Sequence, residues 1–174
     1  MNKELLLTGQ ERFFSEDELI VTKTDLKGRI TYANEVFLNI AGYGEQEILG
    51  KPHNIVRHPD MPRCVFKLLW DAIAAGREIF AYVVNRAKNG DHYWVFAHVT
   101  PSFDSSGEVI GYHSNRRVPN RATIDGTIVP LYRTLIDLER SQADRKAGME
   151  ASMKAVKDFL MIEGKSYDEW VFSI

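Results

Sequence analysis

The sequence predicts an α+β domain with an antiparallel sheet, followed by a C-terminal helical segment. Strand-like and helix-like stretches are segregated along the chain, which is typical of this fold class. Their order is two short strands, several short helices, one longer helix and a meander of three strands. We expect an N-terminal leader in residues 1–16, the domain in residues 17–118 and the helical segment in residues 119–174.

The first two strands form a predicted hairpin. Residues 17–25 show β-branched alternation, and a Lys27-Gly28 turn leads into a second short run over residues 29–33. Asn34 can cap the helix that follows. The apolar face of that helix consists of Val36, Phe37, Ile40 and Ala41.

The longer helix is predicted to begin near Asp60 and Pro62, because an acidic residue followed by proline is a common helix-start pattern. Gly76 closes this helix. Its apolar face, at helical spacing, consists of Val65, Phe66, Leu69, Trp70 and Ile73.

Three strand-like runs follow, over residues 78–88, 92–104 and 108–118. Asn89-Gly90 joins the first two, and this dipeptide between alternating runs is among the strongest hairpin signals. A looser turn, DSSG, joins the last two. Because side chains alternate across a strand, Tyr93 and Trp94 must face opposite sides of the sheet, one toward the core or a pocket.

Two helices are predicted after a short linker. The first tolerates Pro130 only near its start, and its polar end continues to Gly148. The second covers residues 149–164, and a terminal piece, residues 166–174, carries aromatic side chains that look exposed. The apolar face of the first helix consists of Ile124, Ile128, Leu131, Leu135 and Leu138. Since these elements are too small to form a core alone, we expect them to pack on the sheet, on a second copy or on another protein.

Composition excludes several classes of protein. The 174 residues are 44% hydrophobic and 26% charged, as in an ordinary globular protein. The net charge of −2 provides no basic field, so we expect no nucleic-acid partner. A single cysteine, Cys64, excludes an internal disulfide and suits a reducing compartment. No apolar run approaches the ~20 residues that span a bilayer, so we expect a cytoplasmic protein without direct membrane insertion.

Several phrases of the sequence resemble a known family. TDLKGRITYAN, EILGKPHN and KNGDHYWV resemble PAS domains, whose fold is a five-stranded antiparallel sheet with flanking helices. More narrowly, PHNIVRHPDMP, the Leu-Trp pair at 69–70 and NRAKNGDHYW resemble the FAD-binding PAS domain of bacterial aerotaxis receptors. The resemblance extends from about residue 20 to residue 135.

This resemblance implies a function. PAS domains of this group bind FAD non-covalently and report redox state. The chain looks most like the standalone PAS half of a bipartite energy-taxis receptor, whose partner is a membrane-bound, HAMP-containing methyl-accepting chemotaxis receptor on a separate chain. We expect signalling by protein–protein contact, recruitment to the inner membrane face through that partner, and C-terminal helices that dock or form a homodimer. We expect no enzyme, because the chain shows no catalytic carboxylate pair, nucleophile elbow or phosphate loop.

Three residues match the flavin-binding motif of that group, namely Arg57, His58 and Asp60. Arg57 offers a forked donor to a phosphate or a flavin carbonyl, and His58 can donate, accept or stack on a ring. Asp60 can accept from an adenine or ribose group. Alternatively, Asp60 caps the helix and Arg57 is a solvated surface charge. His53 and Asn34 are further cofactor-binding candidates, although Asn34 can instead serve only as a cap.

Trp70 and Asn85 match positions that line the flavin ring in related redox-sensing PAS domains. An indole N–H and an amide can bond to the polar edge of the ring, and an amide can rotate to present a donor or an acceptor, so Asn85 is a candidate redox switch. Alternatively, Trp70 packs in the core and Asn85 is an ordinary polar residue of an edge strand. The aerotaxis pattern has a tryptophan where this chain has Ile79, which changes an aromatic wall.

Two other functions stay open at this point. A ligand-free PAS module would serve only for dimerisation or scaffolding. A heme-binding gas sensor would use His53 or His58 as the iron ligand. A photoactive flavin–cysteine adduct is not expected, because the light-sensing pattern places its cysteine in a short helix that reads KPHNIV here, and we interpret Cys64 as a buried apolar residue.

Overall fold

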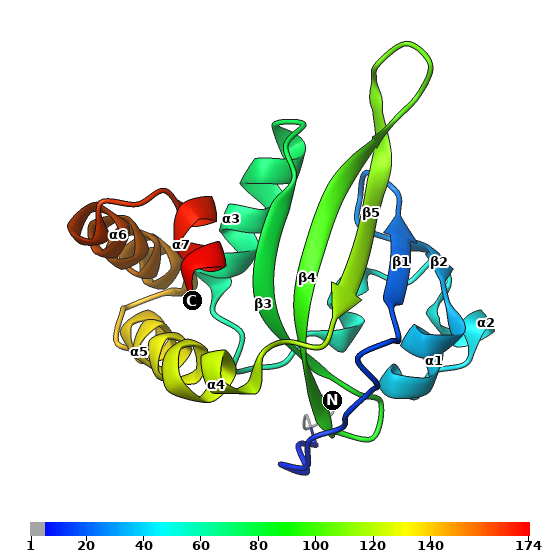
Figure 1. The fold of residues 1–174 in the computed structure, drawn as a ribbon, viewed down its shortest axis with the longest axis horizontal. Coiled ribbons are helices and arrows are strands. Elements are labelled where there is room, and N and C mark those ends of the chain that lie inside the picture. The colour runs from blue at the N-terminus through cyan, green and yellow to red at the C-terminus, as the bar shows by residue number, and fades with distance from the viewer. Residues whose placement is uncertain (1–5) are drawn as a thin grey trace.

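A five-stranded antiparallel sheet forms the centre of the chain, in the order β2-β1-β5-β4-β3 (Figure 1). In this computed structural model, which describes residues 6–174, the strands are β1 (Ile20–Thr24), β2 (Ile30–Ala33), β3 (Ile79–Arg86), β4 (His92–Phe103) and β5 (Val109–Arg117). The predicted fold class, the first hairpin and the three-strand meander are confirmed. The first five residues of the predicted leader lie outside the described residues.

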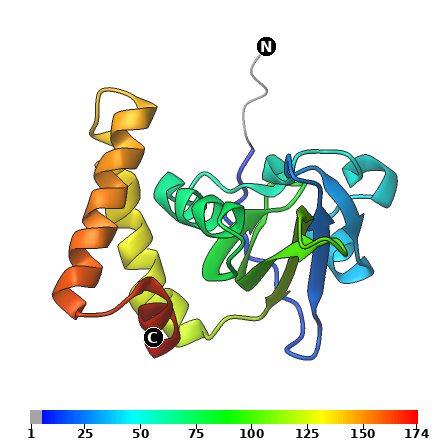
Figure 2. The same ribbon diagram turned by 90° about the horizontal axis from the view of Figure 1, so that it is seen from above.

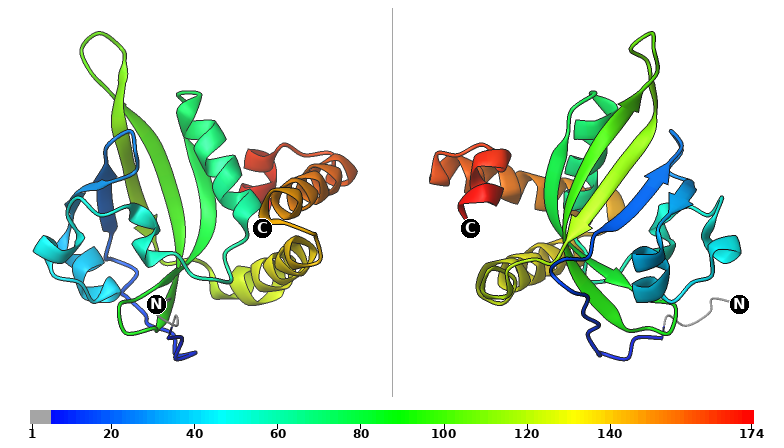
Figure 3. Two further views of the ribbon diagram at one scale, coloured as in Figure 1. Left: turned by 180° about the vertical axis from the view of Figure 1, so that it is seen from behind. Right: turned by 45° about the vertical axis from the view of Figure 1, so that its right-hand side comes forward.

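The elements between β2 and β3 cover one face of this sheet, here called the inner face (Figure 3, left). They are α1 (Glu35–Ala41), α2 (Glu45–Ile48), the 3-10 helix η1 (His53–Val56) and α3 (Arg63–Ala74). The core lies between these helices and the sheet, and includes Ile20, Phe37, Ile48, Val56, Cys64, Val83 and Val95. Cys64 is therefore confirmed as a buried apolar residue.

Two helix starts show how local sequence sets the boundaries. Asn34 caps α1 as predicted, since its Oδ1 accepts a hydrogen bond from the Phe37 N–H at 3.1 Å. The predicted cap at Asp60 is wrong, because α3 begins at Arg63 with Pro62 in the N-cap position. Pro62 holds extended backbone (φ −59°, ψ 141°), so helical conformation starts only after it and Asp60 lies too far upstream to cap.

The C-terminal segment wraps around the β3 edge of the sheet (Figures 1 and 2). It comprises α4 (Arg121–Thr123), the π-helical turn η2 (Ile124–Ile128), α5 (Val129–Arg140), α6 (Arg145–Glu163) and α7 (Tyr167–Ser173). The Tyr132 hydroxyl donates to the Tyr82 carbonyl at 2.5 Å, and the Tyr167 hydroxyl donates to the Phe80 carbonyl at 2.8 Å. The segment therefore packs on the sheet. Within residues 6–174, no helix has both the length and the apolarity to cross a membrane.

The helical segment breaks where continuous helix was predicted. Residues 141–144 separate α5 from α6, because Asp144 caps a new helix by accepting two backbone N–H groups at 2.8 and 2.9 Å. Gly148, predicted as an end, lies inside α6, where a Cβ atom would be 2.5 Å from the Glu139 carbonyl oxygen. The terminal piece is helix α7, and its predicted exposure is wrong for Trp170, which is buried.

An N-terminal segment, residues 8–12, pairs with the turn between β3 and β4. The Thr8 N–H donates to the Gly90 carbonyl at 3.0 Å. Arg12 forms an ion pair with Asp91, with Nε and Oδ2 2.8 Å apart. No sequence pattern predicted this pairing, which joins residues about 80 positions apart.

Asp91 is expected to make folding sensitive to acid. Hydrogen bonds from Thr8, Arg12 and Asn89 lower the pKa of Asp91 from 3.8 to about 2. The folded-state pKa lies below the unfolded value. The carboxylate's contribution to the free energy of unfolding is therefore complete above about pH 4 and is lost as the pH falls toward about 2. We expect Asp91→Asn to lower the free energy of unfolding in urea at neutral pH, and the difference from wild type to shrink at about pH 3. A constant difference would contradict this assignment, and Asp158→Asn, in an exposed pair, is the control.

Candidate functional site

A cavity of about 460 Å³ lies between the inner face of the sheet and α3. Its size falls within the roughly 300–1,000 Å³ of small-molecule sites. Much of its wall is apolar, with Val56, Phe66, Leu69, Ile73, Val83, Ala97 and Val99 among the lining residues. The polar residues of the wall therefore decide which ligands it can bind.

Four of the seven predicted site residues line this cavity. His53 comes from η1, Arg57 from the segment after it, Trp70 from α3 and Asn85 from β3. The fold thus brings together residues that are far apart in the sequence. The other three predicted residues, Asn34, His58 and Asp60, are not among the lining residues.

The Asn34 side chain is used by the backbone around it. Its Oδ1 accepts the N–H groups of Val21 and Phe37 at 3.0 and 3.1 Å, and its Nδ2 donates to the Leu19 carbonyl at 2.7 Å. These bonds fix the start of α1 against β1. The geometry supports the capping alternative, and cofactor binding by Asn34 stays a prediction.

His58 and Asp60 organise the loop behind Arg57. His58 is buried, and its Nδ1 accepts the Asp60 backbone N–H at 3.1 Å. Burial lowers the pKa of His58, which favours a neutral ring with its proton on Nε2. The exposed Asp60 carboxylate lies 3.8 Å from the same Nδ1. The RHPD motif therefore places only Arg57 in the cavity wall.

Arg57 presents a guanidinium to the cavity. It lies over the Phe66 ring, 4.6 Å from the ring centroid. Desolvation, followed by the charge of Arg63, lowers the pKa of Arg57. A half-buried cation next to another cation favours an anionic ligand.

The buried end of the cavity holds a polar network around Arg116, which the sequence analysis did not single out. Its Nη2 donates to Thr22 Oγ1 at 2.9 Å and to His53 Nε2 at 2.7 Å. Because a guanidinium only donates, Nε2 must accept, so His53 is neutral with its proton on Nδ1. Burial and then the charge of Arg116 lower the pKa of His53 to about 3, in agreement with a neutral ring.

Two buried polar atoms on β5 have no hydrogen-bond partner among the described residues, Arg116 Nη1 and Ser114 Oγ. Both residues line the cavity. Burial lowers the pKa of Arg116 to about 10, which still leaves it charged at neutral pH. These unused donors fit a ligand that offers acceptors and negative charge. A sequence signal existed, because Ser114 and Arg116 alternate with Tyr112 on one face of a predicted strand.

Every charged residue that the described chain contributes to the cavity wall is a lysine or an arginine. Lys27 and Lys67 are exposed and Arg57 and Arg63 half-buried, so these four mark the mouth, while Arg116 lies at the buried end. Among the described residues, the lining includes no Asp or Glu. In a chain with a net charge of −2, this concentration of positive charge is local, and it indicates an anionic ligand with an apolar or aromatic body.

Trp70 covers part of the opening. The residue is 40% exposed, and its indole lies edge-on to Tyr112, with 5.7 Å between ring centroids. It also rests against Gly28, where a Cβ atom would lie 3.1 Å from an indole carbon. Gly28 has a φ of +72°, so glycine serves both the turn and this close approach.

Asn85 faces the cavity from β3. The residue is 4% exposed, and its side chain forms no hydrogen bond to another residue of the described chain. Its backbone pairs with that of Arg57 in an isolated antiparallel bridge. Ile79, the departure from the aerotaxis pattern, does not line the cavity. It is buried in contact with Ile73 and Val99, which do line it. The change at this position therefore lies beside the wall, on the same face of β3 as Val83 and Asn85.

The other sequence candidates lie outside the wall. Tyr93 is the inward residue of its pair and is fully buried, which raises its pKa, while Trp94 faces outward and lies 6.1 Å from Tyr132. Burial raises the pKa of the Cys64 thiol to about 11, so this thiol is not poised for reaction. Over residues 6–174, no three His, Cys, Asp or Glu side chains gather as a metal site.

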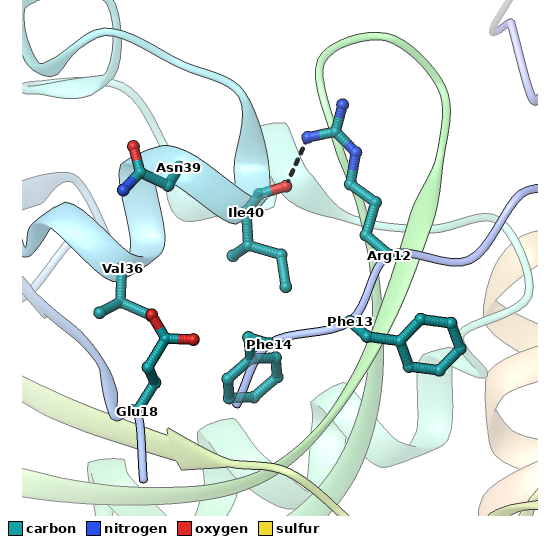
Figure 4. Close-up of a pocket in the computed structure, with 7 residues that line it drawn as sticks. All are labelled: Arg12, Phe13, Phe14, Glu18, Val36, Asn39 and Ile40. Carbon is teal, nitrogen blue, oxygen red and sulfur yellow. Dashed lines mark hydrogen bonds between the residues drawn. The ribbon is translucent and has the colours of Figure 1, made fainter. Parts of the chain in front are cut away.

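A second hollow, of about 390 Å³, lies between the N-terminal segment and α1 (Figure 4). Its lining residues are Arg12, Phe13, Phe14, Glu18, Val36, Asn39 and Ile40. Its cation is already engaged, since Arg12 donates to the Ile40 carbonyl at 2.9 Å and pairs with Asp91. It contains none of the predicted residues, so the larger cavity is the candidate site.

Residues 30–116, half of the chain, match the family described as PAS fold. An aerotaxis receptor from Escherichia coli (strain K12) is 40% identical over 137 residues, which cover 78% of this chain and 26% of the receptor. Phototropin-2 from Oryza sativa subsp. japonica is 30% identical over 110 residues, which cover 63% of this chain and 12% of the phototropin. The chain thus spans about a quarter or less of the length of these relatives.

Solved structures have the same fold. The light state of the blue-light photoreceptor Aureochrome1 LOV is similar with a TM-score of 0.56 and 25% identity, over 63% of this chain and 88% of that chain. A variant of the fungal photoreceptor VVD has a TM-score of 0.51 and 27% identity, over 58% of this chain and 76% of that chain. One of the two relatives is named as a receptor, and both structures are of photoreceptors. The chain therefore belongs to the PAS family, and its domain is of the aerotaxis-receptor type.

Proposed function

We propose that this chain is an FAD-binding sensor of redox or energy state that signals by protein contact to a separate membrane chemoreceptor. The observation that carries the proposal is the cavity whose charged wall residues are all cationic and whose buried end has unpartnered donors. FAD combines an aromatic ring with a pyrophosphate, which matches an apolar wall with a cationic mouth. Similarity to an aerotaxis receptor supports the same choice.

The wall residues fall into two groups with respect to FAD. Asn85, Ser114 and Arg116 offer polar groups at the buried end, suited to the polar edge of the ring. Arg57 and Arg63 stand at the mouth and suit the phosphates. When bound, the flavin supplies reversible uptake of electrons and protons. The protein's part is to hold the ring, exclude water and keep a fixed positive charge beside it.

We propose that the sheet carries the signal from the cavity to the partner. Asn85 lies on the inner side of β3, and an amide can exchange donor for acceptor by rotating. The outer side of β3 contacts the C-terminal segment. The Tyr82 and Phe80 carbonyl groups of β3 accept hydrogen bonds from two tyrosine hydroxyls of that segment. A change at Asn85 would shift β3 and thereby α5 and α7. These helices would pass the change to a HAMP-containing chemotaxis receptor or to a second copy of the chain.

The same observations weigh against the two alternatives. A ligand-free scaffold has no use for a buried cation, whose desolvation costs several kcal/mol unless a ligand offsets it. A heme sensor needs a free histidine nitrogen at the cavity, but His53 Nε2 already accepts from Arg116 at 2.7 Å. His58 does not line the cavity.

An absorption spectrum of the freshly purified protein tests the proposal, followed by chromatography of whatever heat releases. Two visible flavin bands and released FAD are the expected result. A sharp Soret band would replace the proposal with the heme sensor. If no chromophore is present even after incubation with FAD, the scaffold function would replace it.

Arg57→Ala should give folded protein with FAD affinity reduced roughly 10- to 100-fold, because it removes one charge-assisted contact at the mouth. Asp60→Ala should also be flavin-poor, with a smaller loss, because its exposed carboxylate acts on the cavity only through the loop that carries Arg57. Arg77→Ala, exposed and outside the lining, is the matched control. Full flavin content in both variants, measured by absorbance against folded protein, would refute the site.

Arg116→Met should separate ligand binding from stability. We expect FAD affinity to fall at least about tenfold. The free energy of unfolding of the ligand-free protein should fall by no more than about 1 kcal/mol, or should rise. Thr22 Oγ1 lies 3.3 Å from His53 Nε2, so these two partners can bond to each other once the guanidinium is gone. Arg117→Met, exposed on the same strand, is the control for titration and urea unfolding. A large loss of stability with unchanged FAD affinity would make Arg116 a structural residue.

A further inference from the structure

One wall residue of the cavity comes from the C-terminal helices, beyond the end of the PAS family match. Met149 lies on α6, whereas the match ends at residue 116, yet Met149 is among the lining residues. Figure 2 shows the pair α5 and α6, here called the hairpin, beside α3. The site is therefore completed by the C-terminal segment.

A buried carboxylate fixes the hairpin to α3. Glu139 of α5 is 7% exposed, and its Oε1 accepts the Cys64 N–H at 3.2 Å and the Ser152 hydroxyl at 2.9 Å. Cys64 is in the first turn of α3 and Ser152 is on α6, so one side chain joins three helices. The bonded N–H is one of those that a helix start leaves unsatisfied.

α3 in turn forms a wall of the cavity. Arg63, Phe66 and Trp70 all line it, and the helix start that Glu139 bonds is next to Arg63. The Arg63 Nη1 atom lies 4.0 Å from Glu139 Oε2. A displacement of the hairpin would therefore remove Met149 from the wall and release the first turn of α3.

Positive charge also gathers where the hairpin meets the mouth. Arg57, Arg63 and Arg145 come from three different parts of the chain. Burial first, and then the charge of Arg63, lower the pKa of Arg57; Glu139 raises it, and Arg145 lowers it further. Glu139 offsets part of the repulsion among these three cations, since one carboxylate faces three positive charges at the joint between the hairpin and the domain. An anion held at the mouth relieves that repulsion, so it favours the docked hairpin.

We propose that the hairpin is a ligand-coupled wall of the site, so that FAD binding and docking of the hairpin on α3 stabilise each other. This inference rests on the proposed function. Coupling of this kind is reciprocal: whatever FAD contributes to docking, docking contributes to FAD affinity. It gives the C-terminal segment a direct contact with the ligand, in addition to its contact with the outer face of the sheet.

The test uses the full chain and two methionines of the same helix. Met149→Ala should weaken FAD binding about fivefold, because it removes apolar contact at the wall. Met161→Ala, 78% exposed near the other end of α6, should bind FAD like wild type. Hydrogen exchange of α5 and α6 is measured with and without saturating FAD. We expect FAD to slow exchange in wild type and in Met161→Ala, and to slow it less in Met149→Ala.

Riboflavin, which lacks the phosphates, provides a second comparison. It should protect the hairpin less than FAD at equal occupancy, because it leaves the repulsion at the mouth in place. If FAD binds but leaves hairpin exchange unchanged, or if Met149→Ala binds FAD like wild type, the inference is overturned and the proposed function stands. If wild type binds no added FAD, both are overturned.

Discussion

Burying the Arg116 guanidinium without a carboxylate costs free energy, and the rest of the cavity is arranged around that cost. His53 stays neutral and accepts from it, and Thr22 gives it a second acceptor. An Asp or Glu in the wall would have neutralised this charge within the protein, but residues 6–174 contribute neither to the lining. Its Nη1 has no partner among the described residues, and under the proposed function it is available to the ligand. The cation is therefore best understood as stability given up for binding, as is common at functional sites.

The second organising feature is β3, an edge strand that is covered on both faces. Side chains on its inner side line the cavity, and two of its carbonyl groups accept hydrogen bonds from the hydroxyls of Tyr132 and Tyr167. Edge strands are prone to unwanted pairing, and the C-terminal segment protects this one. The same segment reaches around the edge to contact α3 through Glu139. Ligand site and C-terminal helices thus share a strand and a helix.

Local patterns predicted what is locally determined. Strand alternation, the Asn89-Gly90 turn and the Asn34 cap depend on neighbours in the sequence, and all three are present in the structure. The polar network could not be predicted from local patterns, because Arg116 contacts His53 only once the strands have paired and η1 has packed on the sheet. The RHPD motif alone did not show that only Arg57 of its residues lines the cavity, because this depends on the pairing of Arg57 with Asn85 of β3. The helix break before α6 was not predicted. Asp144 lies in a polar stretch, where an aspartate is a weak signal for a helix start unless the packing of α6 on α5 is known.

The three tryptophans are distributed in a way that makes the protein its own optical probe. Trp70 stands half-exposed at the mouth of the cavity, whereas Trp94 and Trp170 lie where the outer face of the sheet and the C-terminal helices pack. Emission from the first reports on the entrance of the cavity, and emission from the other two reports on the packing between the sheet and the C-terminal helices. Replacing one indole at a time would therefore resolve, by intrinsic fluorescence alone, whether the two sides of the molecule respond together or in sequence.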